Sequence, residues 1–119
     1  MQAAQAKKAT YEIRLVNIGG FVQAMNAPLM MKTGETVRFS SEDGTIIIKL
    51  LKGSPFRDAS GSELTEITGP KAVGSDHLSA QIERDDAFEM LCYIMLDNGE
   101  VIAYDPNSKV PGVNIKVGH

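Results

Sequence analysis

Apolar and polar residues alternate along most of this chain, which is the two-residue period of a β-strand with one face in a core. Turn-forming residues separate the alternating runs at short intervals, and no long stretch has the spacing of an amphipathic helix. Short, closely spaced strands predict an antiparallel sandwich or barrel of about seven to nine strands. The runs that predict strands are residues 11–18, 29–32, 35–39, 46–51, 78–82, 88–95, 101–104 and 113–117, while 21–28 fits either a strand fragment or a loop.

Two dipeptides give the clearest hairpin signals. Asp43-Gly44 and Asn98-Gly99 both supply the positive φ that a tight hairpin turn needs. Between them, residues 46–51 are β-branched and almost all apolar, which predicts a central strand that is buried on both faces. The break after this strand contains Phe56, which we expect to anchor the chain to the core.

The pattern dissolves between residues 57 and 76, where Gly, Ser and Pro are frequent. Leu64 and Ile67 are the expected tethers to the core, and a helical turn at 62–66 could form with Ser62 as its cap. Loops this long are uncommon in small domains and often carry function. We therefore predict a contact surface on the 57–77 loop, with these polar candidates: Arg57, Asp58, Glu63, Lys71 and His77.

The chain of 119 residues suits one domain, which we place at 10–119 after a flexible arm at 1–9. The arm could equally be the start of a mature exported chain, so an exported and a cytoplasmic location are both open. No run of 18 apolar residues predicts membrane insertion. The net charge is −3 and the basic residues are scattered, which argues against nucleic acid as a partner.

Three segments resemble those of cupredoxin-like, or plastocyanin-like, domains. They are residues 34–39 (GETVRF), 88–92 (FEMLC) and the closing stretch from Asn98-Gly99 through Asp105-Pro106 to 113–117 (VNIKV). The resemblance covers most of residues 11–117 in order. It implies an all-β fold, an antiparallel Greek-key β-sandwich.

The resemblance also implies a copper site made of two His, one Cys and an axial Met. Cys92 stands at the position of the Cys ligand and Met95 follows it. Histidines would be expected near residues 45–47 and between Cys92 and Met95, but neither stretch contains one. Trigonal copper needs both imidazoles. We therefore expect a scaffold without metal or other cofactor, with copper-dependent electron transfer through Cys92, Met95 and His77 as the alternative.

Other chemistry has little support in the sequence. The phosphate-loop, dinucleotide, zinc-protease and nucleophile-elbow motifs do not occur. Asp85 and Asp86, with Glu83 nearby, resemble a small acidic cluster, but adjacent Asp residues commonly just begin a turn. A small hydrolase or isomerase with an acidic site built from Asp85, Asp86 or Asp105 remains a third hypothesis.

The leading hypothesis is a non-enzymatic binding or assembly module whose partner is an unknown protein or small molecule. Its motivation is the predicted rigid sandwich together with the shortage of groups for catalysis: one Cys and two His in the whole chain. Strands at the sheet edges also offer a route to a homodimer, because their backbone groups are unpaired.

Overall fold

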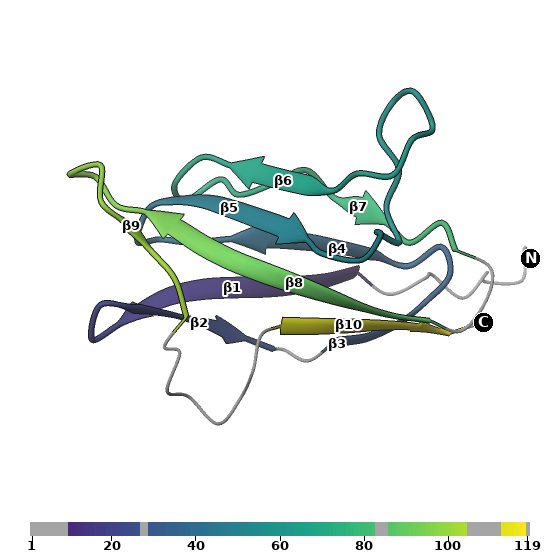
Figure 1. The fold of residues 1–119 in the computed structure, drawn as a ribbon, viewed down its shortest axis with the longest axis horizontal. Coiled ribbons are helices and arrows are strands. Elements are labelled where there is room, and N and C mark those ends of the chain that lie inside the picture. Colours follow the sequence, from purple (N-terminus) through teal and green to yellow (C-terminus); the bar gives the residue numbers. More distant parts are fainter. Residues whose placement is uncertain (1–9, 27–28, 83–85, 105–112, 119) are drawn as a thin grey trace, which may run out of the picture.

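The computed structural model describes residues 10–26, 29–82, 86–104 and 113–118, and within them the chain forms ten strands and no helix (Figure 1). The all-β prediction is therefore confirmed. The strands are β1 (Thr10–Ile18), β2 (Phe21–Met25), β3 (Leu29–Lys32), β4 (Thr36–Ser40), β5 (Thr45–Leu50), β6 (Glu66–Gly69), β7 (Leu78–Ser79), β8 (Asp86–Met95), β9 (Val101–Ile102) and β10 (Val113–Gly118).

The strands form two sheets. Sheet A has the order β2-β1-β4-β7, and sheet B has the order β3-β10-β8-β5-β6, with β9 paired to the far half of β8. Each sheet contains one parallel pair, β1 with β4 and β3 with β10. The sheets are therefore mixed, whereas the sequence predicted antiparallel pairing alone. Alternation of side chains is the same in both kinds of pairing, so it could not reveal the difference.

The segment 21–32 explains how the parallel pairs arise. Its first half, β2, turns back on β1 in sheet A, and its second half, β3, lies against β10 in sheet B. The next strand, β4, then returns to sheet A and lies beside β1 in the same direction. One long stretch of chain thus crosses between the two layers, and this crossing ties them together.

The core lies between the two sheets and is filled by alternate residues of each strand. Burying one such side chain stabilises the fold by roughly 1.5–3 kcal/mol. The side chains that are completely enclosed include Ile13, Leu15, Val37 and Phe39 from sheet A and Ile46, Ile48, Met90, Ile94 and Ile115 from sheet B.

The two ends of the sandwich differ. At one end lie the β1–β2, β4–β5 and β8–β9 turns, and we call this the turn end. At the opposite end, the loop end, the chain between β5 and β6 projects from the body (Figure 1). Strand β6 follows this loop and pairs with β5. The predicted 57–77 loop is thus two separate segments, and 62–66 forms no helical turn.

Candidate functional site

The projecting loop is held closed by its own polar residues. Arg57 and Glu63 form an isolated antiparallel bridge across its base. The Arg57 guanidinium donates hydrogen bonds to the carbonyl oxygens of Ser54 at 2.8 Å and Phe56 at 3.1 Å. The Arg57 side chain therefore braces the backbone where the loop leaves the core.

Asp58 organises the tip of the same loop. Its Oδ1 accepts hydrogen bonds from the Ser60 hydroxyl at 2.6 Å, the Ser60 amide at 2.9 Å and the Ser62 amide at 3.1 Å. These bonds, the one from the Ser60 hydroxyl first, lower the pKa of the Asp58 carboxyl. An aspartate that bonds backbone amides two and four residues ahead is a turn-forming group, so its carboxylate is largely occupied within the loop.

The other two predicted contact residues lie elsewhere. The Lys71 ammonium is 2.7 Å from Asp97 Oδ2 at the turn end, and this hydrogen bond raises the pKa of Lys71. His77 is exposed and directly precedes β7 at an edge of sheet A. The predicted contact residues therefore lie at separate places in the structure, and their role in binding stays a prediction. Strand β6 separates Arg57, Asp58 and Glu63 from Lys71 and His77.

The residues of the copper hypothesis also lie apart. Cys92 points into the core and is 4% exposed, whereas Met95 is three residues along β8, on the opposite face, and is 38% exposed. His77 belongs to the other sheet. Burial raises the pKa of the Cys92 thiol to about 12. In the described ranges, no three side chains among His, Cys, Asp and Glu are grouped to hold an ion.

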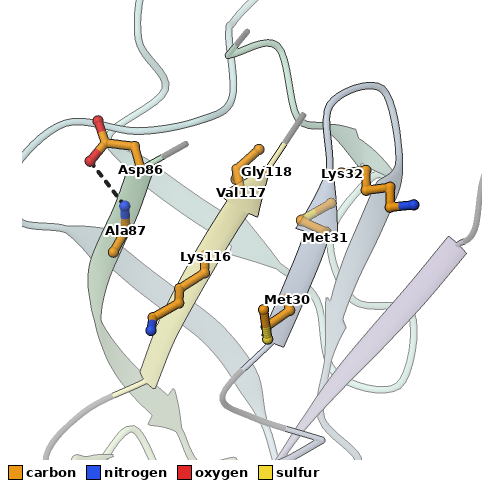
Figure 2. A pocket seen from close by; sticks show the side chains of 8 residues that line it. All are labelled: Met30, Met31, Lys32, Asp86, Ala87, Lys116, Val117 and Gly118. Atoms are coloured by element: carbon orange, nitrogen blue, oxygen red, sulfur yellow. Dashed lines mark hydrogen bonds between the residues drawn. The ribbon is translucent and has the colours of Figure 1, made fainter. Parts of the chain in front are cut away.

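Only one residue of the acidic hypotheses can be placed. Asp86 opens β8, and its Oδ1 accepts a hydrogen bond from the Ala87 amide at 2.9 Å. Glu83, Asp85 and Asp105 lie outside the described residues. A shallow hollow of about 470 Å³ adjoins Asp86 on the outside of sheet B (Figure 2). Its lining consists of Met30, Met31, Lys32, Asp86, Ala87, Lys116, Val117 and Gly118.

The chemistry of this hollow is that of a sheet surface. Asp86 is the one carboxylate in the lining, so the hollow does not bring together the two acids that general acid–base work requires. Its lining combines the outward-facing Met30, Ala87 and Lys116 with the buried Met31 and Val117, and Met30 is 73% exposed. We therefore assign no reaction to it.

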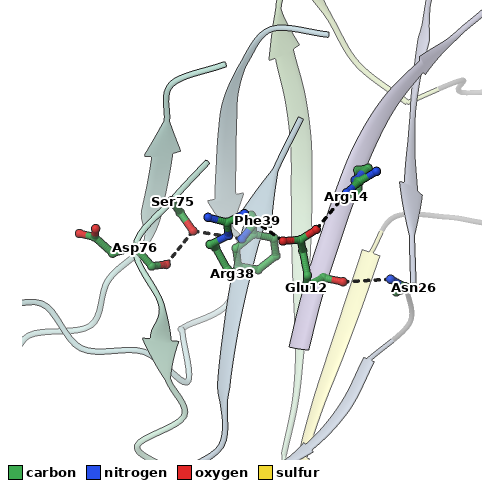
Figure 3. Close-up of polar contacts among 7 residues, drawn as sticks. All are labelled: Glu12, Arg14, Asn26, Arg38, Phe39, Ser75 and Asp76. Atoms are coloured by element: carbon green, nitrogen blue, oxygen red, sulfur yellow. Dashed lines mark hydrogen bonds and ion pairs between the residues drawn. The ribbon is translucent and has the colours of Figure 1, made fainter. Parts of the chain in front are cut away.

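Over β1 and β4, the outer face of sheet A is polar and internally paired (Figure 3), whereas towards β2 it carries the exposed apolar side chains of Ile18, Phe21 and Met25. Glu12 lies 3.0 Å from Arg38 and 3.3 Å from Arg14, and the hydrogen bond from Arg38 is the main cause that lowers the pKa of Glu12. At the edge of this sheet, the Ser75 hydroxyl accepts a bond from the Phe39 amide and donates one to the Asp76 carbonyl. The part of this face over β1 and β4 has the charged character of a solvated surface.

The outer face of sheet B is different. Ile47 lies directly opposite Tyr93, Met95 lies opposite Val101, and Leu91 precedes Tyr93 on the same face. Val101 is 52% exposed, while Ile47, Leu91 and Tyr93 are half-buried by one another and by neighbouring side chains. We call these five residues the apolar face. No other described strand covers it (Figure 1).

The sequence contained a signal for this surface. Residues 46–51 are apolar at both alternating sets of positions, and we interpreted this as burial on both sides. The strand is central in sheet B, as predicted, but Ile47 points away from the core. Leu91, Tyr93 and Met95 occupy the equivalent outward positions of β8. A strand with apolar residues on both faces, in a sandwich of two layers, predicts an outer surface that favours contact.

Comparison with known proteins adds no assignment to this geometry. No protein-family model matches the chain, and no curated protein matches its sequence. The described part of the chain contains no helix that is both long and apolar enough to cross a membrane.

Proposed function

We propose that the protein is a non-enzymatic binding or assembly module on a cupredoxin-like scaffold that has no copper site. The observation that carries the proposal is the apolar face, formed by Ile47, Leu91, Tyr93, Met95 and Val101 on adjacent strands of sheet B. Proteins rarely leave contiguous apolar side chains in water unless a partner covers them. The part of the outer face of sheet A over β1 and β4, where Glu12 pairs with Arg14 and Arg38, is the internal contrast.

The cupredoxin-like part of the proposal has a topological support. The segments that carry the resemblance fall on strands of one sandwich: residues 34–39 include the first four residues of β4, residues 88–92 lie in β8, and 113–117 lie in β10. Strand β10 pairs with β8, so the two later segments are neighbours in space. Two facing sheets with a strand segment that crosses between them are compatible with that family's sandwich.

The metal-free part of the proposal depends on side-chain direction. Cys92, at the position of the copper ligand, is enclosed in the core, and residues 45–47, where one histidine was expected, are Thr and Ile. The thiol would have to lose its proton in an apolar environment without a positive neighbour, which burial opposes. A core cysteine that packs as a small apolar residue fits these facts better than a ligand.

A fluorescent dye tests whether the apolar face is open to binding. We expect the uncharged dye Nile red to bind dilute folded protein and Ile47→Lys to abolish most of that binding. Val16→Lys is the matched control, because Val16 is a half-buried β-branched residue on the outer face of sheet A. Absence of dye binding by the dilute wild-type chain, or equal loss in both variants, contradicts the proposal.

Copper distinguishes the alternative function. Electron transfer through Cys92 requires that added Cu(II) produce an intense thiolate-to-copper absorption, and that Cys92→Ser remove it. We expect no such band with the folded protein. A band that depends on Cys92 would replace the binding module with a copper protein.

A further inference from the structure

We infer that the apolar face is covered by a second copy of this chain, in a two-fold symmetric dimer that packs sheet B against sheet B. The inference rests on the proposed function, because it names the partner for the same face. Face-to-face packing of two sheets, at about 10 Å, is the usual way in which a sheet buries an apolar side.

The register of β5 and β8 makes this face complementary to itself. Ile47 is opposite Tyr93, and Lys49 is opposite Leu91, with Glu89 two residues before Leu91 on β8. A two-fold axis parallel to the strands, between β5 and β8, places β5 of one copy over β8 of the other. Ile47 then meets the partner's Tyr93, and this contact occurs twice by symmetry.

The charges beside the apolar face follow the same symmetry. Lys49 and Glu89 are both exposed and both point outward from sheet B. In the two-fold arrangement, Lys49 of each copy lies over the partner's Leu91 and beside the partner's Glu89. Two ion pairs of opposite sense therefore border the apolar contact, and such complementary charges fix orientation and exclude other arrangements.

The charged residues beside the apolar face argue against a strongly charged partner. Lys49 stands between two glutamates, Glu66 in register with it on β6 and Glu89 on β8. With one lysine and two glutamates beside the apolar centre, a polyanion or an anionic membrane surface would find no attraction there. The surface that best matches an apolar centre bordered by charges of both signs is its own copy.

Three of the edge strands, β2, β6 and β7, are less suited to joining two copies. Strand β6 has four residues and is followed by Pro70, which lacks an amide donor, while β7 has two residues. At the edge of sheet A, the Val22 amide already donates to the Ala103 carbonyl at 2.8 Å. The homodimer that the sequence placed at sheet edges is therefore better placed at the outer face of sheet B.

Sedimentation equilibrium over a range of concentrations tests the dimer. We expect the wild-type chain to approach twice 12.9 kDa, and Ile47→Lys to raise the dissociation constant at least about tenfold. Val16→Lys, on the outer face of sheet A, should leave the dimer unchanged. Circular dichroism of each variant confirms that the fold is retained.

Charge reversal tests the symmetry itself. Lys49→Glu and Glu89→Lys should each weaken the dimer about tenfold, because each places like charges together across the axis, and the double variant should restore it. Single variants that weaken the dimer without rescue in the double variant overturn this arrangement. A dimer that is insensitive to Ile47→Lys overturns the choice of face.

The dye experiment separates failure of the dimer from failure of the proposed function. Nile red binding that persists at high concentration, with the mass of one chain throughout, overturns the dimer and leaves the binding face in place. A monomer that binds no dye contradicts both. Release of the dye as the mass rises from one chain to two supports both the dimer and the binding face.

Discussion

Phe56 meets Phe39 edge to face, with ring centroids 6.5 Å apart and the ring planes at 83°. Phe39 belongs to β4 in sheet A, whereas Phe56 belongs to the chain that follows β5 in sheet B, and both are completely buried. Such a contact contributes about 0.5–1.5 kcal/mol beyond the burial of the rings. The aromatic pair thus joins the two layers and holds the base of the projecting loop.

Truncation of this anchor should be costly. We expect Phe56→Ala to lower the free energy of unfolding by about 3–5 kcal/mol, because it leaves a cavity in a closed core. Phe21→Ala is the matched control, since Phe21 is 42% exposed at the start of β2 and its loss leaves no cavity. Urea denaturation of both variants measures the difference, and equal losses would show that Phe56 is not part of the core.

The role of Phe56 shows what could be predicted from sequence. An aromatic residue after a Gly-Ser-Pro break is expected to anchor the chain, and alternation locates most strands because one face of each is buried. Strand β6 escaped prediction because its four residues, Glu-Ile-Thr-Gly, give only two alternations among turn residues. Without β6, the sequence pattern joins two segments that lie apart in the structure, one that contains Arg57 and one that contains Lys71.

The candidate site was harder to predict than the fold. Polar residues in an irregular segment suggest binding, but Asp58 and Arg57 satisfy backbone groups of their own loop, and a pattern along the chain does not show this. The apolar face was present in the sequence as Ile47. Whether Ile47 is buried or exposed depends on how many layers the fold has, and alternation within one strand does not determine that number.

The glycines of two hairpin turns differ in why they are needed. A Cβ on Gly44 would lie 2.1 Å from the Met95 carbonyl oxygen, whereas a Cβ on Gly99 would meet no atom within 4 Å but would sit at a φ of +88°. We expect Gly44→Ala to destabilise by about 3 kcal/mol, because backbone must move, and Gly99→Ala by only about 1–2 kcal/mol of conformational strain. Thermal denaturation compares them; a larger loss at Gly99 would contradict the close approach at Gly44.

The ion pairs of Glu12 predict a pH dependence. The pKa of Glu12 is lowered in the folded state, so its pairs stabilise the protein above the carboxyl's unfolded pKa, and this contribution is lost as the pH falls through the lowered value. Arg38→Met should raise the pKa of Glu12 more than Arg14→Met, because the hydrogen bond from Arg38 is the main cause. Carbon-detected NMR titration of the Glu12 carboxyl measures both, and a larger effect of Arg14 would reverse the assignment.

Cys92 and Met95 provide a test of side-chain direction on a single strand. With a pKa of about 12, the Cys92 thiol is ionised to about one part in ten thousand at pH 8, and burial also blocks access. We expect no reaction with a thiol reagent in the folded protein and full reaction on unfolding. A cysteine placed on the opposite face, as Met95→Cys in a Cys92→Ala background, should react readily in dilute, monomeric folded protein, since Met95 is exposed in the single chain. Fast labelling of native Cys92 would mean that the core opens at β8, and it would reopen the case for a metal ligand there.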